Sequence, residues 1–185
     1  MPIDDLWYLA TRAEQAAERA YHALTASHDD FLEFDRQRSV SRRRFRTLAE
    51  RVERTGSPYG AHTLVYRDNG DILLVRHDHV DLWVLPGGGI DGDESFREAA
   101  ERELAEEAGV DATYDGLAMV TSVSFQCSGY SSWGVLPVFE AVAEDTELVV
   151  DDPDDEITDA AWFADLPEDT RDRAHLQRWR ERALS

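Results

Sequence analysis

The sequence contains no lysine, one cysteine and no long hydrophobic run, and each of these absences excludes a class of protein. All 19 basic residues are arginines. The single cysteine, Cys127, excludes an internal disulfide and a cysteine-based zinc site, which is typical of a reducing compartment. No apolar stretch approaches the roughly 20 residues of a membrane-spanning helix, and Met1 to Leu9 already contains two acids, unlike a signal peptide. We therefore expect a cytoplasmic protein without a membrane partner.

Positive charge is scarce: 39 acidic residues against 19 arginines give a net charge of −20. A compact protein resists such a charge through self-repulsion, which about 1 M salt screens because the Debye length falls to about 3 Å. The composition resembles that of haloarchaeal cytosolic proteins, which predicts a halophilic protein; an acidic protein of a low-salt cell is the alternative. The same charge disfavours binding to bulk nucleic acid or to an anionic membrane.

The stretch from Pro86 to Val110 joins a glycine turn to a carboxylate-rich helix. Ser95 and Glu98 form a capping box, and Gly109 is a stop signal, so a helix is predicted between Ser95 and Gly109. This places the acidic residues of the stretch on a defined helical face.

Three glutamates of this helix, Glu103, Glu106 and Glu107, have a spacing that puts them on neighbouring parts of one face. Like charges at this spacing repel by roughly 0.2–0.5 kcal/mol per pair, so we expect a cation beside them. Carboxylates without histidine or cysteine favour Mg²⁺ or Mn²⁺ over Zn²⁺. Mg²⁺ held in this way completes its shell with water and substrate phosphates, which predicts phosphate-ester or phosphoanhydride chemistry.

The residues from Gly88 to Val110 resemble the Nudix box, Gx5Ex7REUxEExGU, at every defined position. The resemblance implies an Mg²⁺- or Mn²⁺-dependent hydrolase that cleaves the diphosphate bond of a nucleoside diphosphate linked to another moiety. It implies a metal site formed by Gly87, through its carbonyl, with Glu103, Glu106 and Glu107. The implied catalytic set is Glu103, Glu106, Arg102 and Glu94. In that set, Glu103 or a nearby acid activates the attacking water, and a salt bridge between Arg102 and Glu94 braces the loop.

One departure from the common pattern lies in the loop before the helix. Many members read Glu-Pro-Gly-Glu where this chain has Asp91-Gly92-Asp93-Glu94. The spacing is kept while the glycine moves, so we expect a slightly different loop and intact metal binding.

The resemblance implies a small-molecule substrate of the ADP-ribose, nucleotide-sugar or (d)NTP class, and the sequence does not choose among them. Tyr130 and Trp133 could bind it by stacking on a base, worth about 1–3 kcal/mol where such stacking occurs; packing within the loop or core is the alternative. The alternative function is a non-catalytic Nudix-like nucleotide-sensing module. Such modules usually lack some of the acidic residues of the box, and all of them are present here. An isoprenoid diphosphate isomerase, a third reading, needs a catalytic cysteine, and Cys127 has no such setting.

The predicted fold class is α/β (α+β): a Nudix-type α/β/α sandwich with a mixed sheet over residues 57–185, preceded by an N-terminal helical extension over residues 1–56. Three helices are expected in the extension, over Asp4–Leu24, around Phe31–Phe34, and after Ser41. Such a short extension should pack on the catalytic domain or on a second copy, giving a homodimer.

Alternating and β-branched segments predict the strands of the sheet. They cover residues 61–67, 72–77, 82–85, 116–125, 133–143 and 158–163, and residues 148–150 are a further candidate. Asp68-Asn69-Gly70-Asp71 predicts a hairpin turn. A final helix runs to Leu184 with Leu176 and Trp179 facing inward.

A cluster of arginines stands out on the acidic background: Arg42, Arg43, Arg44 and Arg46. It could contact phosphate. The alternative is a solvated helix face whose arginines pair with Glu50, Glu53 and the acids of the preceding segment.

Overall fold

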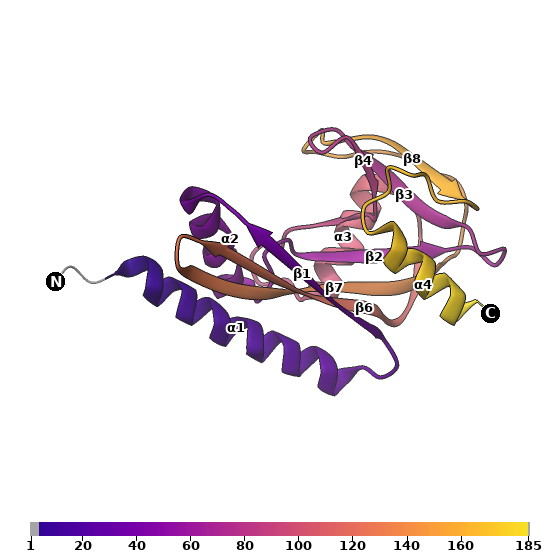
Figure 1. Cartoon of the computed structure of the whole chain (residues 1–185). Coiled ribbons are helices and arrows are strands. Elements are labelled where there is room, and N and C mark those ends of the chain that lie inside the picture. Colours follow the sequence, from indigo (N-terminus) through magenta and orange to yellow (C-terminus); the bar gives the residue numbers. More distant parts are fainter. Residues whose placement is uncertain (1–3, 185) are drawn as a thin grey trace. The chain divides into compact units, whose positions relative to one another are not determined.

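The computed structural model describes residues 4–184, over which the chain forms four helices and eight strands (Figure 1). These residues fall into two compact units, one of residues 4–60 and 119–137, the other of residues 61–118 and 138–184. Two long strands, β6 (Ala112–Cys127) and β7 (Tyr130–Ala143), contribute to both. The predicted domain boundary between residues 56 and 57 stays a prediction. The outermost residues of the two predicted domains, 1–3 and 185, lie outside the described part of the chain.

The first unit begins with α1 (Asp5–Ser27), β1 (Leu32–Ser39) and α2 (Arg42–Thr55). Each helix starts at a side chain that satisfies free backbone N–H groups. Asp4 accepts a hydrogen bond from the N–H of Leu6 at 3.2 Å, and Ser41 accepts one from the N–H of Arg44 at 3.1 Å. α2 ends at Gly56, whose φ of 87° is a left-handed conformation that glycine adopts at little cost.

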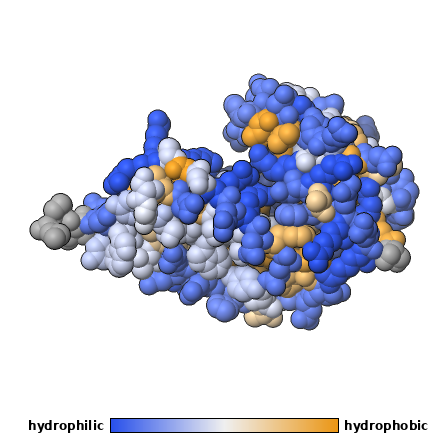
Figure 2. All heavy atoms as spheres, in the orientation of Figure 1, coloured by the Kyte–Doolittle hydropathy of each residue, from blue (hydrophilic) through white to orange (hydrophobic). Residues whose placement is uncertain are grey.

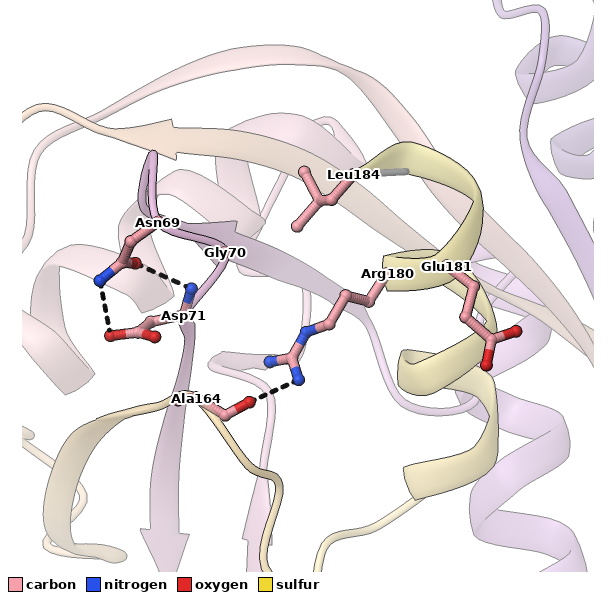
Figure 3. Close-up of a pocket in the computed structure, with 7 residues that line it drawn as sticks. All are labelled: Asn69, Gly70, Asp71, Ala164, Arg180, Glu181 and Leu184. Atoms are coloured by element: carbon pink, nitrogen blue, oxygen red, sulfur yellow. Dashed lines mark hydrogen bonds between the residues drawn. The ribbon is translucent and has the colours of Figure 1, made fainter.

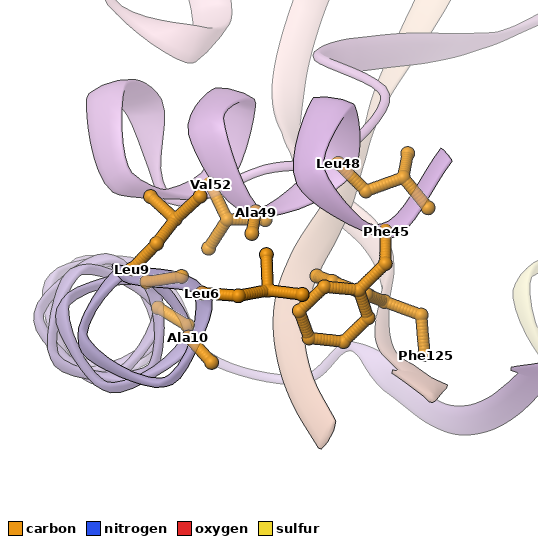
Figure 4. Close-up of a cluster of buried hydrophobic side chains, with 10 residues drawn as sticks. Leu6, Leu9, Ala10, Phe45, Leu48, Ala49, Val52 and Phe125 are labelled. Carbon is orange, nitrogen blue, oxygen red and sulfur yellow. The ribbon is translucent and has the colours of Figure 1, made fainter. Parts of the chain in front are cut away.

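A hydrophobic cluster between the two helices and β6 forms the core of the first unit (Figure 4). Its aromatic centre is Phe45 against Phe125, with ring centroids 5.2 Å apart in an edge-on arrangement. The remaining members are Leu6, Leu9, Ala10, Ala13, Ala17, Leu48, Ala49 and Val52. The apolar face predicted for α1 is therefore buried as its spacing required.

The predicted helix around Phe31–Phe34 is wrong, because β1 begins at Leu32 and includes Phe34. This strand pairs in parallel with β6, from Leu32 opposite Met119 to Ser39 opposite Gln126. Its side chains alternate between more and less buried, the period of a strand. A strand takes its backbone hydrogen bonds from a partner that is distant in sequence, so a short apolar run by itself does not distinguish it from a helix. Over residues 4–56, the extension contains two helices and one strand.

The second unit contains a mixed sheet. β2 (Ala61–Tyr66) is parallel to β7 and antiparallel to β3 (Ile72–His77) and β5 (Gly87–Gly88); β3 is also antiparallel to β4 (Leu82–Val84) and β8 (Ile157–Phe163). The predicted hairpin turn between β2 and β3 is present. Gly70 has a φ of 90°, and the N–H of Asp71 donates to Oδ1 of Asn69 at 3.0 Å.

Helices cover both faces of this sheet: α3 (Phe96–Ala108) and α4 (Arg173–Ala183). Val65 lies in a buried cluster with Leu104 of α3, while the ring of Tyr66 lies 5.1 Å from that of Trp179 of α4. Because consecutive strand residues point to opposite faces, the two helices lie on opposite sides of β2. This confirms the predicted α/β/α arrangement, and Leu176 and Trp179 are buried as predicted.

Two segments differ from expectation. The candidate strand at residues 148–150 is irregular, and the N–H of Val149 donates to the carbonyl of Ala108 at 2.7 Å instead of joining the sheet. β6 and β7 are longer than predicted, which leaves only Ser128 and Gly129 as the turn between them. The face of the protein seen in Figure 2 is mostly hydrophilic, in keeping with the net charge of −20. None of the described helices combines the length and apolar character of a membrane span.

Candidate active site

The glycine turn before α3 is held against the sheet by strand pairing. Gly88 lies opposite Ala61, and Gly87 lies opposite His62. A Cβ atom on Gly87 would come within 2.4 Å of the His62 ring, so a side chain at this position would displace the turn. Close backbone approach therefore requires glycine here.

The helix that follows has the predicted ends. Oγ of Ser95 accepts a hydrogen bond from the N–H of Glu98 at 3.1 Å, and the Glu98 carboxylate accepts one from the N–H of Ser95 at 3.2 Å. Gly109 stops α3 with a φ of 64°. The capping box and the stop signal are both confirmed, and together they fix which face of α3 carries the glutamates.

Arg102 connects the helix to the loop. Its guanidinium contacts both oxygens of Glu94, at 2.7 and 3.1 Å, and donates to the carbonyl of Gly89 at 2.9 Å. The fork geometry of arginine suits this two-point contact. The hydrogen bonds from Arg102, helped by its positive charge, hold the pKa of Glu94 below its usual range. The salt bridge implied by the Nudix box is present, and its contribution to catalysis stays a prediction.

Two of the glutamates on α3 are packed against the glycine turn. A Cβ atom on Gly88 would meet an oxygen of Glu103 at 2.5 Å, so this carboxylate lies directly on the turn. Glu107 is 6% exposed, and its Oε2 accepts a hydrogen bond from the N–H of Gly87 at 3.0 Å. Burial raises the pKa of Glu103, and it raises that of Glu107 to about 9 despite the Gly87 hydrogen bond. A buried carboxylate of this kind favours a cation beside it.

The donor set fits a hard divalent cation, although the side chains are engaged with other groups. Arg102 contacts Glu103 at 2.9 Å and Glu106 at 3.3 Å. Over residues 4–184, no three acidic, histidine or cysteine side chains converge closely enough to enclose an ion. The carboxylates nevertheless supply only oxygen donors, share one helical face and include the buried Glu107, which is the chemistry that Mg²⁺ or Mn²⁺ prefers.

Sequence reasoning missed an acidic segment beside these glutamates. The N–H of Asp151 donates to the carbonyl of Glu106 at 3.0 Å, which ties the segment after β7 to α3. The charge of Asp152 raises the pKa of Glu103 and Glu107, and that of Glu156 also raises the pKa of Glu107. The high density of acidic residues over residues 151–156 could have indicated this segment. No pattern of neighbouring residues, however, connects it with α3, which ends at residue 108.

The two residues predicted to stack on a base lie in the first unit. The Tyr130 ring is 6.1 Å from that of Phe45, and its hydroxyl donates to Asp4. Trp133 packs against the same hydrophobic cluster, with its ring 6.5 Å from that of Tyr21. These contacts fit the packing alternative, and substrate binding by Tyr130 and Trp133 stays a prediction.

A cavity of about 340 Å³ in the second unit is distinct from the carboxylates (Figure 3). It lies between the β2–β3 turn and α4, and Arg180 spans it to donate to the carbonyl of Ala164 at 2.6 Å. Its lining residues are Asn69, Gly70, Asp71, Ala164, Arg180, Glu181 and Leu184. None of the predicted catalytic or metal residues lies among them, so the candidate active site is the acidic face of α3.

Curated relatives match part of the chain. A putative 8-oxo-dGTP diphosphatase of Bacillus subtilis is 37% identical over 89 residues, which cover 48% of this chain and 60% of that protein. A CTP pyrophosphohydrolase of Escherichia coli is 44% identical over 54 residues, which cover 27% of this chain and 39% of that protein. The chain therefore spans less than two thirds of the length of either relative.

A solved structure and a family model match a larger part of this chain than the curated relatives do. The NUDIX domain of Shewanella oneidensis NrtR, solved with ADP ribose, aligns with 91% of this chain and 99% of its own at a TM-score of 0.52 and 20% identity, which shows a shared fold. The model of the NUDIX domain matches residues 56–179, which include the glycine turn, α3 and the acidic segment. This chain belongs to the NUDIX domain family.

Proposed function

We propose that this chain is a divalent-metal-dependent hydrolase that cleaves the phosphoanhydride bond of a nucleoside diphosphate derivative. The observation that carries the proposal is the acidic face of α3, where the buried Glu107 and the half-buried Glu103 lie against a turn braced by Arg102 and Glu94. A surface helix that served only solubility would have no reason to bury a carboxylate.

Each residue of the site has a proposed role. Glu103, Glu106 and Glu107 would hold Mg²⁺ or Mn²⁺ together with the carbonyl of Gly87, and the bound ion would supply charge neutralisation of the phosphates and a more acidic water. Glu103 or a neighbouring acid takes the proton of the attacking water. Arg102 and Glu94 keep the turn in register with the helix. Asp152 and Glu156 add negative charge next to the same carboxylates, which strengthens their attraction for a cation.

The names of two curated relatives support one of the proposed substrate classes. Both curated relatives are named for nucleoside triphosphates, an oxidised dGTP and CTP, which supports the (d)NTP class ahead of ADP-ribose and nucleotide sugars. We propose a small-molecule substrate, and no binding along bulk nucleic acid because of the net charge of −20. We also propose that the extension, residues 1–56, forms a homodimer with the extension of a second copy of the chain.

A substrate panel tests the function. We expect release of pyrophosphate or of a nucleoside monophosphate from at least one of oxidised dGTP, CTP, ADP-ribose or a nucleotide sugar, in the presence of Mg²⁺ or Mn²⁺. EDTA should abolish the release. The assay requires low and high KCl in parallel, so that loss of fold is not mistaken for lack of activity. Nucleotide binding without release from any compound would contradict hydrolysis and favour a sensing module.

We also propose that the acidic composition is an adaptation to an intracellular medium rich in salt, as in haloarchaea. Lowering KCl from about 2 M to about 0.1 M lengthens the Debye length from a few ångströms to about 10 Å, and self-repulsion grows accordingly. The midpoint of thermal unfolding, followed by circular dichroism, should therefore fall. Sucrose in place of the withdrawn salt serves as the control for solvent exclusion. An unchanged midpoint in dilute buffer would contradict the proposal.

A further inference from the structure

The start of α2 carries the densest positive charge of the chain. Six of the 19 arginines lie between Arg36 and Arg46, and no acidic residue occurs from position 36 to position 49. Five of the six side chains are exposed. They form what we call the arginine patch: Arg38, Arg42, Arg43, Arg44 and Arg46. On a chain with a net charge of −20, this local excess calls for an explanation.

The structure argues against a simple solvated face with internal ion pairs. Glu53, a candidate partner of the patch, instead pairs with Arg12 of α1 at 2.5 Å. Within residues 4–184, four members of the patch form no ion pair: Arg38, Arg43, Arg44 and Arg46. Arg42 alone has an electrostatic partner in Asp4 and lies over the Tyr130 ring, 5.3 Å from its centroid. Most of the patch is therefore available to an external anion.

Helix stability does not explain the patch either. The N-terminus of a helix carries a partial positive charge, so cations in the first turn are unfavourable and acids are preferred there. The first turn of α2 has no acidic residue and begins with Arg42, Arg43 and Arg44. A choice of residues that works against the local structure is expected where a binding function selects it.

Two exposed aromatic rings lie near the start of α1, and one of them, Tyr8, shares a cavity with Arg46 of the patch. Trp7 and Tyr8 of α1 are 56% and 48% exposed, and their ring centroids are 5.1 Å apart. Tyr8 and Arg46 line one cavity of about 300 Å³ between α1 and α2. The cavity is also lined by Leu9, Arg12, Asp5, Glu50 and Glu53, so its three acids outnumber its two arginines. The exposed ring of Tyr8 in this cavity suits a base, and the arginines of the patch suit phosphates.

We propose that the arginine patch together with Trp7 and Tyr8 binds single-stranded nucleic acid. Guanidinium groups contact phosphates in a two-point geometry, and bases stack on exposed aromatic rings. An acidic polypeptide would match the arginines but not the rings, which is why nucleic acid is the favoured partner. The net charge of −20 opposes binding along bulk nucleic acid, whether double- or single-stranded. A short single strand, in contrast, needs to contact only the arginine patch and the exposed rings, and salt screens its repulsion from the more distant acidic residues.

Anisotropy of a labelled oligonucleotide of about 12 nucleotides tests the proposal, with RNA and DNA as separate arms. EDTA prevents metal-dependent hydrolysis, so the result does not depend on the proposed enzymatic activity. KCl varies from about 0.1 to 1 M, with sucrose present and circular dichroism as a check that the protein stays folded. We expect the logarithm of the association constant to fall linearly with that of salt concentration.

Variants identify the contacts. R43Q/R44Q should lower affinity at least about 10-fold at about 0.1 M KCl and reduce the salt slope by about 0.7 for each lost phosphate contact. W7A/Y8A should weaken binding while leaving the slope unchanged, because stacking releases no counterions. The matched control is R178Q/R182Q on α4, which removes the same charge from arginines that have partners in the fold. It should bind as the unmodified chain does.

Three results would overturn the proposal. One is no binding of RNA or DNA by folded protein at about 0.1 M KCl. Another is an equal loss of affinity in R43Q/R44Q and in the α4 control, which would indicate a general charge effect. The third is tighter binding of polyglutamate than of either oligonucleotide, which would identify the surface as a contact for acidic proteins. None of these results bears on hydrolysis at the acidic face of α3.

Discussion

Replacing Glu106 by glutamine is expected to lower kcat by roughly 100-fold or more while leaving the protein folded. Its side chain is 28% exposed and contacts Arg102 at 3.3 Å. Glutamine keeps the length of the side chain and the helix propensity but removes the negative charge that would hold the metal. Steady-state kinetics on the best compound of the panel, with circular dichroism on the same samples, measures both effects.

Glu101→Gln is the matched control for this variant. Glu101 lies on the same helix, pairs with Arg97 at 2.8 Å and occupies a variable position of the box. Its replacement removes an equal charge from α3, so activity should stay within about two-fold of the unmodified enzyme, as expected for an exposed i,i+4 pair. Hydrolysis that survives in Glu106→Gln, or that is lost equally in Glu101→Gln, would remove the acidic face of α3 from the mechanism.

Replacing Glu107 by glutamine is expected to have opposite effects on activity and on stability. Activity should fall as in Glu106→Gln. Without divalent ions, however, the variant should be more stable than the unmodified protein by about 1–3 kcal/mol near pH 8. The reason is burial: Glu107 is 6% exposed, and its pKa is raised from 4.5 to about 9. A neutral amide of the same size carries no penalty for a buried charge.

The raised pKa of Glu107 predicts how the free energy of unfolding changes with pH. A carboxyl whose pKa is higher in the folded than in the unfolded protein contributes stability below its ordinary value of 4.5, and that contribution is lost as pH rises toward about 9. Denaturant unfolding in EDTA should therefore show a falling free energy of unfolding over this range, and Glu107→Gln should lack that part of the slope.

The neighbouring glutamate is the control for the stability measurement. Glu106 is more exposed than Glu107, so Glu106→Gln should lose activity without gaining stability in EDTA. Adding Mg²⁺ or Mn²⁺ should raise the unfolding midpoint of the unmodified protein and have little effect on either variant. Equal stability of Glu107→Gln and the unmodified protein across pH 5 to 9 would show that burial does not penalise this carboxylate.

Local signals in the sequence were sufficient wherever neighbouring residues supply the interactions. The capping box of Ser95 and Glu98 and the stop at Gly109 depend on hydrogen bonds within a few residues, and both were predicted correctly. The same holds for the hairpin turn at Asn69-Gly70. Because helical spacing is regular, correct ends were enough to place the three glutamates on one face.

Long-range pairing decided what the sequence left open. Residues 31–34 were mistaken for a helix because the hydrogen bonds that make β1 a strand come from β6. The acidic segment at residues 151–156 could not be connected to α3 from its composition, because its proximity to Glu107 results from backbone contacts with the end of that helix. Placement of Trp133 against Tyr21 likewise follows from packing between distant segments.

The sequence by itself determined the family, the ends of α3 and the residues of its acidic face, because each is encoded at short and fixed spacing. Only the tertiary structure decided that Glu107 is buried, that Asp152 and Glu156 add their charge to it, and that Arg38, Arg43 and Arg44 have no ion pair within residues 4–184. The physical reason is the same in each case: burial and electrostatic environment are set by segments far apart in the chain, which come together only when it folds.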